Sequence, residues 1–344
     1  MNTPVVFPRS FFRSPFRPAA GLGNPHLQTV FASIHRRQPP LIERQRREVA
    51  LPDGDHLLLD WHHPLHPDPA APVVLVVHGL GGSSESHYVR GLQKALGKVG
   101  WPSVAMNCRG AAAPNHATRA YHAGASDDVI SVFRHLAASG YRRIALVGYS
   151  LGGSMVLKSL AELGDDPHLL AGVAVSAPLD LATCANRMDR GLSRVYRKHL
   201  LDELDRLWQG KMAHFRLRGD HAGADRIARH FGRAPFRSFW EFDHHVMAPL
   251  HGFDGVDDYY RRCTPNQFLR DIRKPALIIH AADDPFMTPA VTPRADMLSA
   301  SIHFELSAQG GHVGFIGGSV TRPVYYLEQR IPAFLRHIRA IDGG

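Results

Sequence analysis

The 344-residue sequence has little cysteine, little lysine and no long apolar run. Its three cysteines, Cys108, Cys184 and Cys263, include no CxxC pair, which argues against a disulfide framework or structural zinc and favours a reducing compartment. No stretch approaches the roughly 18 apolar residues of a membrane span. The N-terminus, broken by proline and arginine, lacks the apolar core of a secretory signal. These absences predict a soluble, cytoplasmic protein.

Basic residues are the unusual feature of the composition. The chain has 40 lysines and arginines, of which 34 are arginine, against 31 acidic residues, and its net charge is +9. Residues 1–48 carry +6 and residues 187–237 carry +7, whereas the remainder carries −4. No nucleic-acid-binding motif or interleaved aromatic pattern accompanies these charges, so we predict no nucleic-acid partner. The arginines either form a solvated surface or meet an anionic membrane or acidic substrate near a binding site.

Apolar runs and amphipathic stretches alternate through most of the chain. Two strands are expected between residues 48 and 63, around a turn at 52–55. Further strands are predicted at 73–77, 102–107, 143–148, 170–176, 275–280 and 301–306, and helices at 86–98, 126–138, 151–163 and 323–341. Continuous apolar strands alternating with helices are typical of a mostly parallel sheet covered on both faces.

Two segments depart from this alternation. Residues 1–48 show no periodicity and are expected to be an irregular basic arm, packed on the body and partly ordered. Residues from about 183 to 264 are arginine-rich and helical, without strand signals. We interpret this second segment as a helical cap inserted into a single domain that spans residues 49–344.

Gly148 to Gly152 forms a G-x-S-x-G sequence directly after one predicted strand and before a predicted helix. This context is typical of a nucleophile elbow, which lifts a serine out at the carboxyl edge of a parallel sheet. Glycines suit the turn because its backbone is tight and strained. We therefore predict that Ser150 is a catalytic nucleophile.

A serine hydroxyl needs a base, and the base needs a carboxylate that holds its tautomer. Among 23 histidines, His312 stands out because it lies in a glycine-rich loop after the last sheet strand. Asp283 and Asp284 both follow the strand 275–280. The arrangement usual in α/β-hydrolases favours Asp284 as the acid and leaves Asp283 as a loop brace. The order Ser150, Asp284, His312 is also the order of that fold.

The glycine-rich sequence 78–82, His-Gly-Leu-Gly-Gly, follows the first central strand. The backbone N–H groups of Leu80 and Leu151 are the predicted oxyanion hole. The elbow, the acid, the base and this loop agree in order and placement, which is more specific than any one of them.

With these motifs the sequence resembles the α/β-hydrolases, and more closely their YheT-like branch. The resemblance covers most of the chain from Phe16. Its further motifs are Asn24 to Thr29, Asn107 to Gly110, Tyr121 to Gly124, Glu241 to Asp243, Gly252-Phe253 with Asp258 to Tyr260, and Asp283 to Phe286. It implies the α/β-hydrolase fold and hydrolysis of carboxylic esters by Ser150, Asp284 and His312. Eukaryotic relatives of this branch act on lipid esters and phospholipids. The motif at Asn24 to Thr29 has no mechanism that the sequence reveals.

The predicted function is a serine esterase or lipase-like hydrolase that forms an acyl-enzyme with a small-molecule ester, such as an acylglycerol. A thioesterase or acyltransferase would use the same triad, and a catalytically silent hydrolase would act as a binding module. We predict no cofactor and no metal, because the sequence has no HExxH and the loop at 78–82 does not match GxGxxG. No obligate protein partner is expected, and peripheral contact with an anionic membrane is an open alternative.

Overall fold

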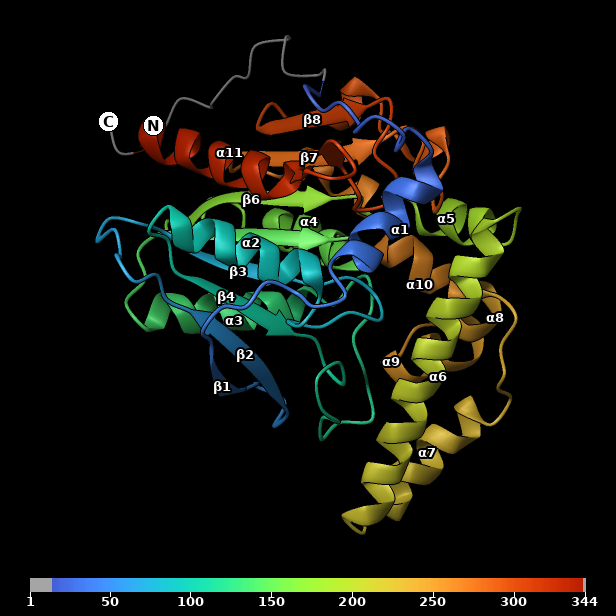
Figure 1. Cartoon of the computed structure of the whole chain (residues 1–344). Helices are drawn as coiled ribbons and strands as arrows, with labels where there is room; N and C mark the ends of the chain where they lie inside the picture. The colour runs from blue at the N-terminus through green and yellow to red at the C-terminus, as the bar shows by residue number, and fades with distance from the viewer. Residues whose placement is uncertain (1–13, 343–344) are drawn as a thin grey trace.

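An eight-stranded sheet forms the centre of the computed structural model, which describes residues 14–342 (Figure 1). The strand order is β1-β2-β4-β3-β5-β6-β7-β8, with β1–β2 and β2–β4 antiparallel and every later pair parallel. The strands are β1 Gln45–Ala50, β2 His56–His62, β3 Val73–Val77, β4 Ser103–Asn107, β5 Ile144–Tyr149, β6 Leu169–Val175, β7 Ala276–Ala281 and β8 Ile302–Ser307. The predicted mostly parallel sheet is confirmed.

Helices cover both faces of the sheet because the parallel strands are apolar on both sides. Helices α2 (His87–Lys98) and α11 (Tyr326–Asp342) pack on one face, and α3 (Ser126–Ala138) and α4 (Leu151–Leu163) pack on the other. Strand β3 serves both layers. Leu75 packs toward α3 and α4, whereas its neighbours Val74 and Val76 pack toward α2 and α11. The continuous apolar run of this strand is thereby explained.

Between β6 and β7 the chain forms a helical segment, residues 181–263, which lies beyond the carboxyl ends of the parallel strands (Figure 1). Its helices are α5 Leu181–Met188, α6 Ser193–Leu217, α7 His221–Phe231, α8 Phe239–Phe242, the π-turn η2 Asp243–Met247, α9 Ala248–His251 and α10 Val256–Cys263. The segment has its own core, in which Trp208 and Ile227 are completely buried. Short 3-10 turns follow at Pro265–Gln267, Leu269–Asp271, Pro289–Val291 and Ala295–Met297. Within residues 14–342, no helix has the length and apolar composition needed to cross a bilayer.

The N-terminal region differs from the expectation of an irregular arm. Residues 1–13 lie outside the described part, but α1 (Pro25–His35) is a regular helix, and β1 starts inside the stretch assigned to the arm. Asn24 starts α1 by accepting the backbone N–H of His26, and Pro25 at the first helical position is already set for helical geometry. The sequence analysis did not predict this helix.

The C-terminal helix also begins later than expected. Residues Pro323–Tyr325 form a short strand, β10, which pairs antiparallel with β9 (Ile316–Gly318). Helix α11 therefore starts at Tyr326 rather than at residue 323. The small β9–β10 sheet lies beside α1.

Candidate active site

Ser150 occupies the sharp turn between β5 and α4, as predicted for a nucleophile elbow. Its φ of 50° places it in the left-handed region, a strain of about 1–3 kcal/mol for a residue with a side chain. The flanking glycines are required by contact. A methyl group at Gly148 would overlap the backbone of Gly152, and one at Gly152 would overlap the carbonyl oxygen of His78. The serine is therefore held at the carboxyl edge of the sheet by a turn that larger residues cannot make.

His312 joins Ser150 to Asp284. Its Nε2 lies 2.9 Å from Ser150 Oγ, and its Nδ1 lies 2.8 Å from Asp284 Oδ2. A carboxylate can only accept, so Nδ1 carries the proton and Nε2 is free to accept the serine hydroxyl. Asp284 is 4% exposed and His312 is 9% exposed, so the pair is shielded from water. The ends of β5, β7 and β8 thus bring these three predicted site residues into one hydrogen-bonded chain.

The two candidate carboxylates have different partners. Asp284 contacts the imidazole, and its other oxygen accepts the N–H of Phe286 at 2.8 Å. Asp283 instead accepts the N–H of Gly311 at 3.0 Å and so braces the loop that carries His312. The ring of Phe286 stacks on the imidazole at 3.9 Å between centroids, with only 9° between the planes. The loop after β7 therefore orients the imidazole through both its edge and its face.

The glycine-rich loop after β3 is fixed on both sides of Leu80. The N–H of Gly79 donates to the hydroxyl of Tyr88 at 3.1 Å, and the N–H of Gly81 donates to that of Tyr121 at 2.9 Å. Leu151 is the first residue of α4, so its N–H has no acceptor inside the helix. In the described part of the chain, neither Leu80 nor Leu151 donates its N–H to another group. Both residues line the same cavity as Ser150.

His78 connects this loop to the residue that follows β4 next to it. Its Nε2 accepts the N–H of Cys108 at 3.1 Å, and its Nδ1 therefore donates to the carbonyl of Gly79 at 2.7 Å. Complete burial lowers the pKa of His78 to about 4, so the ring is neutral and its tautomer is set by these two bonds. Cys108, like Cys184 and Cys263, is a buried free thiol.

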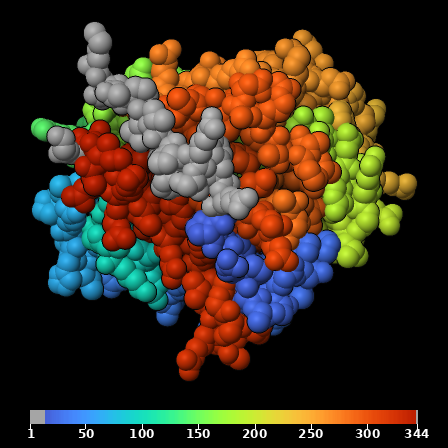
Figure 2. Space-filling model, turned by 90° about the horizontal axis from the view of Figure 1, so that it is seen from above, coloured from blue at the N-terminus to red at the C-terminus, as the bar shows by residue number. Residues whose placement is uncertain are grey.

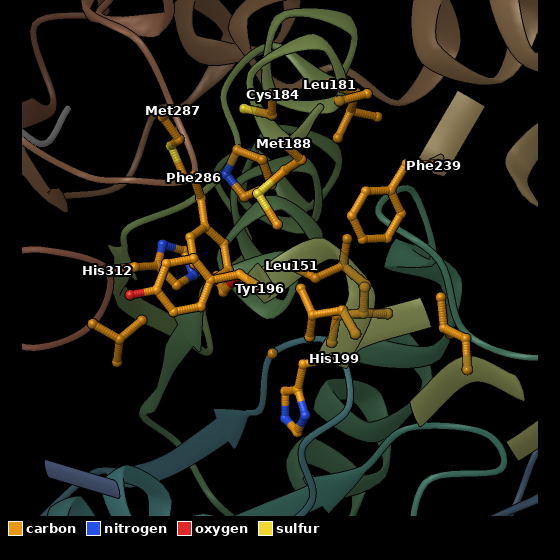
Figure 3. A pocket seen from close by; sticks show the side chains of 18 of the residues that line it. Leu151, Leu181, Cys184, Met188, Tyr196, His199, Phe239, Phe286, Met287 and His312 are labelled. Atoms are coloured by element: carbon orange, nitrogen blue, oxygen red, sulfur yellow. The ribbon is translucent and has the colours of Figure 1, made fainter. Parts of the chain in front are cut away.

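A cavity of about 590 Å³ opens above Ser150 between the sheet and the helical segment. Its wall is mainly apolar and aromatic. Figure 3 shows Leu181 and Phe239 on one side, Tyr196, Phe286 and His312 on the other, and Met188 between them. Helix α1 contributes Thr29, Val30 and Ser33 to the lining, which the sequence reading did not foresee. The arrangement suits a ligand with an extended apolar part beside a reactive group.

Asp243 is the only carboxylate among the described residues that line the cavity. It begins the π-turn η2, and Tyr260 donates its hydroxyl to Asp243 Oδ2 at 2.7 Å. Burial raises the pKa of Asp243 to about 7, although the tyrosine hydrogen bond acts in the opposite direction. Sequence reasoning included both residues in family motifs but assigned them no role. A buried carboxyl beside an apolar cavity could only be identified after folding.

One cluster in residues 14–342 has metal-ligand chemistry. Ligand atoms of Asp55, His56 and His116 lie within 4.8 Å of one another. The oxygens of Asp55, however, already accept hydrogen bonds from Arg109, from Asn115 and from backbone N–H groups. None of the three residues lines the cavity. The donor set therefore fits a buried ionic network better than a metal centre.

Known proteins resemble this chain over most of its length. A family model described as alpha/beta hydrolase fold matches residues 72–319. A protein of Escherichia coli (strain K12) named "Putative esterase YheT" is 39% identical over 330 residues, which cover 93% of this chain and 92% of that protein. Phospholipase ABHD3 of Mus musculus is 25% identical, over 90% of this chain and 75% of its own length.

Solved structures show the same fold at low sequence identity. An esterase of Pyrococcus furiosus superposes with a TM-score of 0.51 and 16% identity, covering 86% of this chain and 91% of its own. A membrane phospholipase A superposes with a TM-score of 0.52 and 16% identity, covering 93% and 94% of the two chains. The match over residues 72–319 and the 39% identity to YheT show that the chain belongs to the α/β-hydrolase superfamily, in its YheT-like branch.

Proposed function

We propose that the protein hydrolyses carboxylic esters, with Ser150 as nucleophile, His312 as general base and Asp284 as the acid that orients it. The observation that carries this proposal is the hydrogen-bonded chain of 2.9 Å and 2.8 Å from Ser150 through His312 to Asp284. Relatives named as an esterase and a phospholipase support the same class of reaction.

The proposed reaction proceeds through an acyl-enzyme. His312 Nε2 takes the proton of Ser150 as its Oγ bonds to the ester carbon, and the N–H groups of Leu80 and Leu151 hold the oxyanion. His312 then gives that proton to the departing alcohol. Water next loses a proton to His312 and attacks the acyl carbon, and Ser150 regains its proton as the acid leaves. Asp284 stabilises the imidazolium in both halves.

The apolar cavity supports an acyl chain as the larger part of the substrate. We propose that the helical segment, predicted to be a cap over residues 183–264, selects this chain, because α5, α6 and α8 supply much of the cavity wall. An acylglycerol or another lipid ester has the required shape. The yeast relative named "Monoacylglycerol lipase", 27% identical over 73% of this chain, favours the same class.

The test uses a fluorophosphonate probe and p-nitrophenyl butyrate. Labelling and turnover are expected in the wild type and lost in Ser150→Ala. Ser154→Ala, one turn along the same helix, is the matched control and should retain both, because its hydroxyl bonds to Pro178 rather than to the triad. If the folded wild type is not labelled, the chain is a silent binding module. If butyryl thioester turnover far exceeds ester turnover, the protein is a thioesterase.

We also propose peripheral contact with an anionic membrane at the cavity mouth. Leu192 is 64% exposed and Val195 is 67% exposed at the start of α6, and Val195 lines the cavity as well. Arg190 and Arg194 are exposed beside them, a pairing of apolar and basic side chains that suits an anionic interface. Binding to phosphatidylglycerol vesicles should exceed binding to phosphatidylcholine vesicles and fall when both arginines are changed to glutamine. Equal binding to the two vesicle types would refute this contact.

A further inference from the structure

The loop that carries His312, residues 310–316, is held by side chains from distant parts of the chain. Three consecutive backbone N–H groups each donate to a different element. These bonds are Gly311 to Asp283 at 3.0 Å, His312 to Thr29 at 3.0 Å, and Val313 to Ser176 at 3.1 Å. The peptide planes on both sides of the imidazole are therefore fixed from outside the loop, and the central bond comes from α1.

The loop needs this support because its backbone is strained. Val313 has a φ of 57° and Phe315 a φ of 48°, whereas Gly311, at 60°, adopts this region without strain. Residues with side chains rarely adopt this region, and such strain persists only where the surroundings over-determine the conformation. The strain therefore makes the position of His312 sensitive to the partners that hold the loop.

Thr29 is placed for this purpose by the start of α1. Its hydroxyl donates to the carbonyl of Pro25 at 2.7 Å, so its lone pair is aimed at the N–H of His312. A methyl group at Gly311 would contact the Thr29 hydroxyl and the Pro25 carbonyl, which explains why the loop carries glycine there. The first turn of α1 and the loop that carries His312 are therefore packed together at the Thr29 hydroxyl.

Gln28 fixes the far end of the loop and is completely buried. Its Oε1 accepts the N–H of Ile316 at 2.7 Å, and its Nε2 donates to the carbonyl of the same residue at 3.0 Å. The amide thus pairs with Ile316 as a neighbouring strand would. In the view from above, the N-terminal residues in blue lie against the C-terminal residues in red (Figure 2).

The first turn of α1 also reaches the helical segment. His26 Nδ1 lies 3.1 Å from the hydroxyl of Tyr196 on α6, and the two rings stack at 5.7 Å. Tyr196 in turn contacts Phe286, whose ring lies on His312 (Figure 3). His312 is therefore connected to α1 in two ways. Its backbone N–H bonds to Thr29, and its ring contacts α1 indirectly through the rings of Phe286 and Tyr196.

From these contacts we infer that Thr29 and Gln28 are positioning residues for His312, and that the motif at residues 24–29 builds the active site rather than a detachable arm. The inference rests on the proposed function of His312 as the base. It assigns to α1 the task of holding Nε2 within reach of Ser150 Oγ. A base displaced by even one ångström loses much of its effect on rate.

The test compares Thr29→Val with Thr29→Ser in the full-length protein. Valine keeps the shape but leaves the N–H of His312 without an acceptor, whereas serine keeps the hydroxyl. For p-nitrophenyl butyrate, Thr29→Val should lower kcat about tenfold, because the loop of His312 loses an acceptor. KM should stay within about twofold, because valine keeps the shape of the cavity wall that Thr29 lines. Thr29→Ser should restore kcat to within about twofold. The rate of Ser150 labelling by the fluorophosphonate should follow kcat.

A control separates positioning from general stability. Ser131→Ala removes a hydroxyl that likewise donates to a carbonyl four residues earlier, but on α3, which does not line the cavity, and its kcat should stay at the wild-type value. Wild-type kcat in Thr29→Val would overturn the inference, as would a loss that serine does not restore. If the wild type itself neither turns over ester nor is labelled, the proposed function fails instead, and the two failures are thereby distinguished.

Discussion

The carboxyl of Asp243 should make the protein less stable as the pH rises. Burial holds the pKa of Asp243 near 7 in the folded chain, against 3.8 for an exposed aspartate. The folded state therefore binds a proton that the unfolded state releases between these two values. The contribution of this carboxyl to the free energy of unfolding is fully present below pH 3.8. It decreases above that pH and is lost as the pH rises through 7. The difference of about three pKa units corresponds to about 4 kcal/mol of unfolding free energy.

Asp243→Asn removes this dependence, since the amide stays neutral and can still accept the hydroxyl of Tyr260. The variant should be more stable than the wild type at pH 8, and its advantage should grow by about 2 kcal/mol between pH 5 and pH 7. The assay is urea unfolding followed by circular dichroism at several pH values, with the m-value checked for constancy.

Asp220→Asn is a control of opposite sign. The guanidinium of Arg218 and the N–H of Gly223 lower the pKa of Asp220, so its contribution is lost as the pH falls. Asparagine still caps α7, which isolates the effect of charge. An Asp243→Asn advantage that is flat, or that shrinks with rising pH, would refute the argument that burial controls this carboxyl.

Three further predictions concern the triad, the elbow and the cavity. Asp284→Asn should lower kcat by about a thousandfold or more, because Asp284 contacts the imidazole. Asp283→Asn should lower kcat by less than about tenfold, because Asp283 contacts only the loop. Equal losses of kcat in steady-state assays would contradict the assignment. Gly152→Ala should cost at least about 3 kcal/mol in urea unfolding, because its methyl would overlap backbone, whereas Gly210→Ala in exposed helix should gain about 0.5–1 kcal/mol. Met188→Trp should shorten the cavity. The ratio of kcat/KM for the dodecanoyl ester of p-nitrophenol to kcat/KM for the butyryl ester should therefore fall about tenfold or more. An unchanged ratio would mean that the acyl chain does not bind beside Met188.

Local sequence was sufficient for the central sheet and for the elbow. Apolar runs of strand length mark β3, β5 and β7, and the glycines around Ser150 mark a turn that tolerates no larger side chain. Parallel strands all end at one edge, so residues that follow those strands must meet there. This rule placed Asp284 and His312 near Ser150 although more than 130 residues separate them from it.

Other parts of the site depend on how side chains from distant parts of the sequence face one another. The periodicity of a local segment gives no information about such contacts. The sequence favours Asp284 over Asp283 only through the arrangement usual in α/β-hydrolases, whereas the contacts of Asp284 with the imidazole and of Asp283 with Gly311 depend on how two loops pack. The burial of Asp243 depends on how the helical segment folds on itself. The burial of Asp243 has no signal in spacing or composition.

The N-terminal region shows most clearly the difference between what the sequence predicts and what depends on tertiary packing. Its lack of periodicity suggested an irregular arm, yet Gln28 is completely buried and Thr29 bonds to a residue 283 positions away. The sequence by itself determined the α/β architecture, the elbow and the order of the candidate triad, because these follow from local periodicity and from the shared edge of parallel strands. Only the tertiary structure decided which groups hold the base in place and what shape the cavity has, because both depend on packing between segments that are distant along the chain.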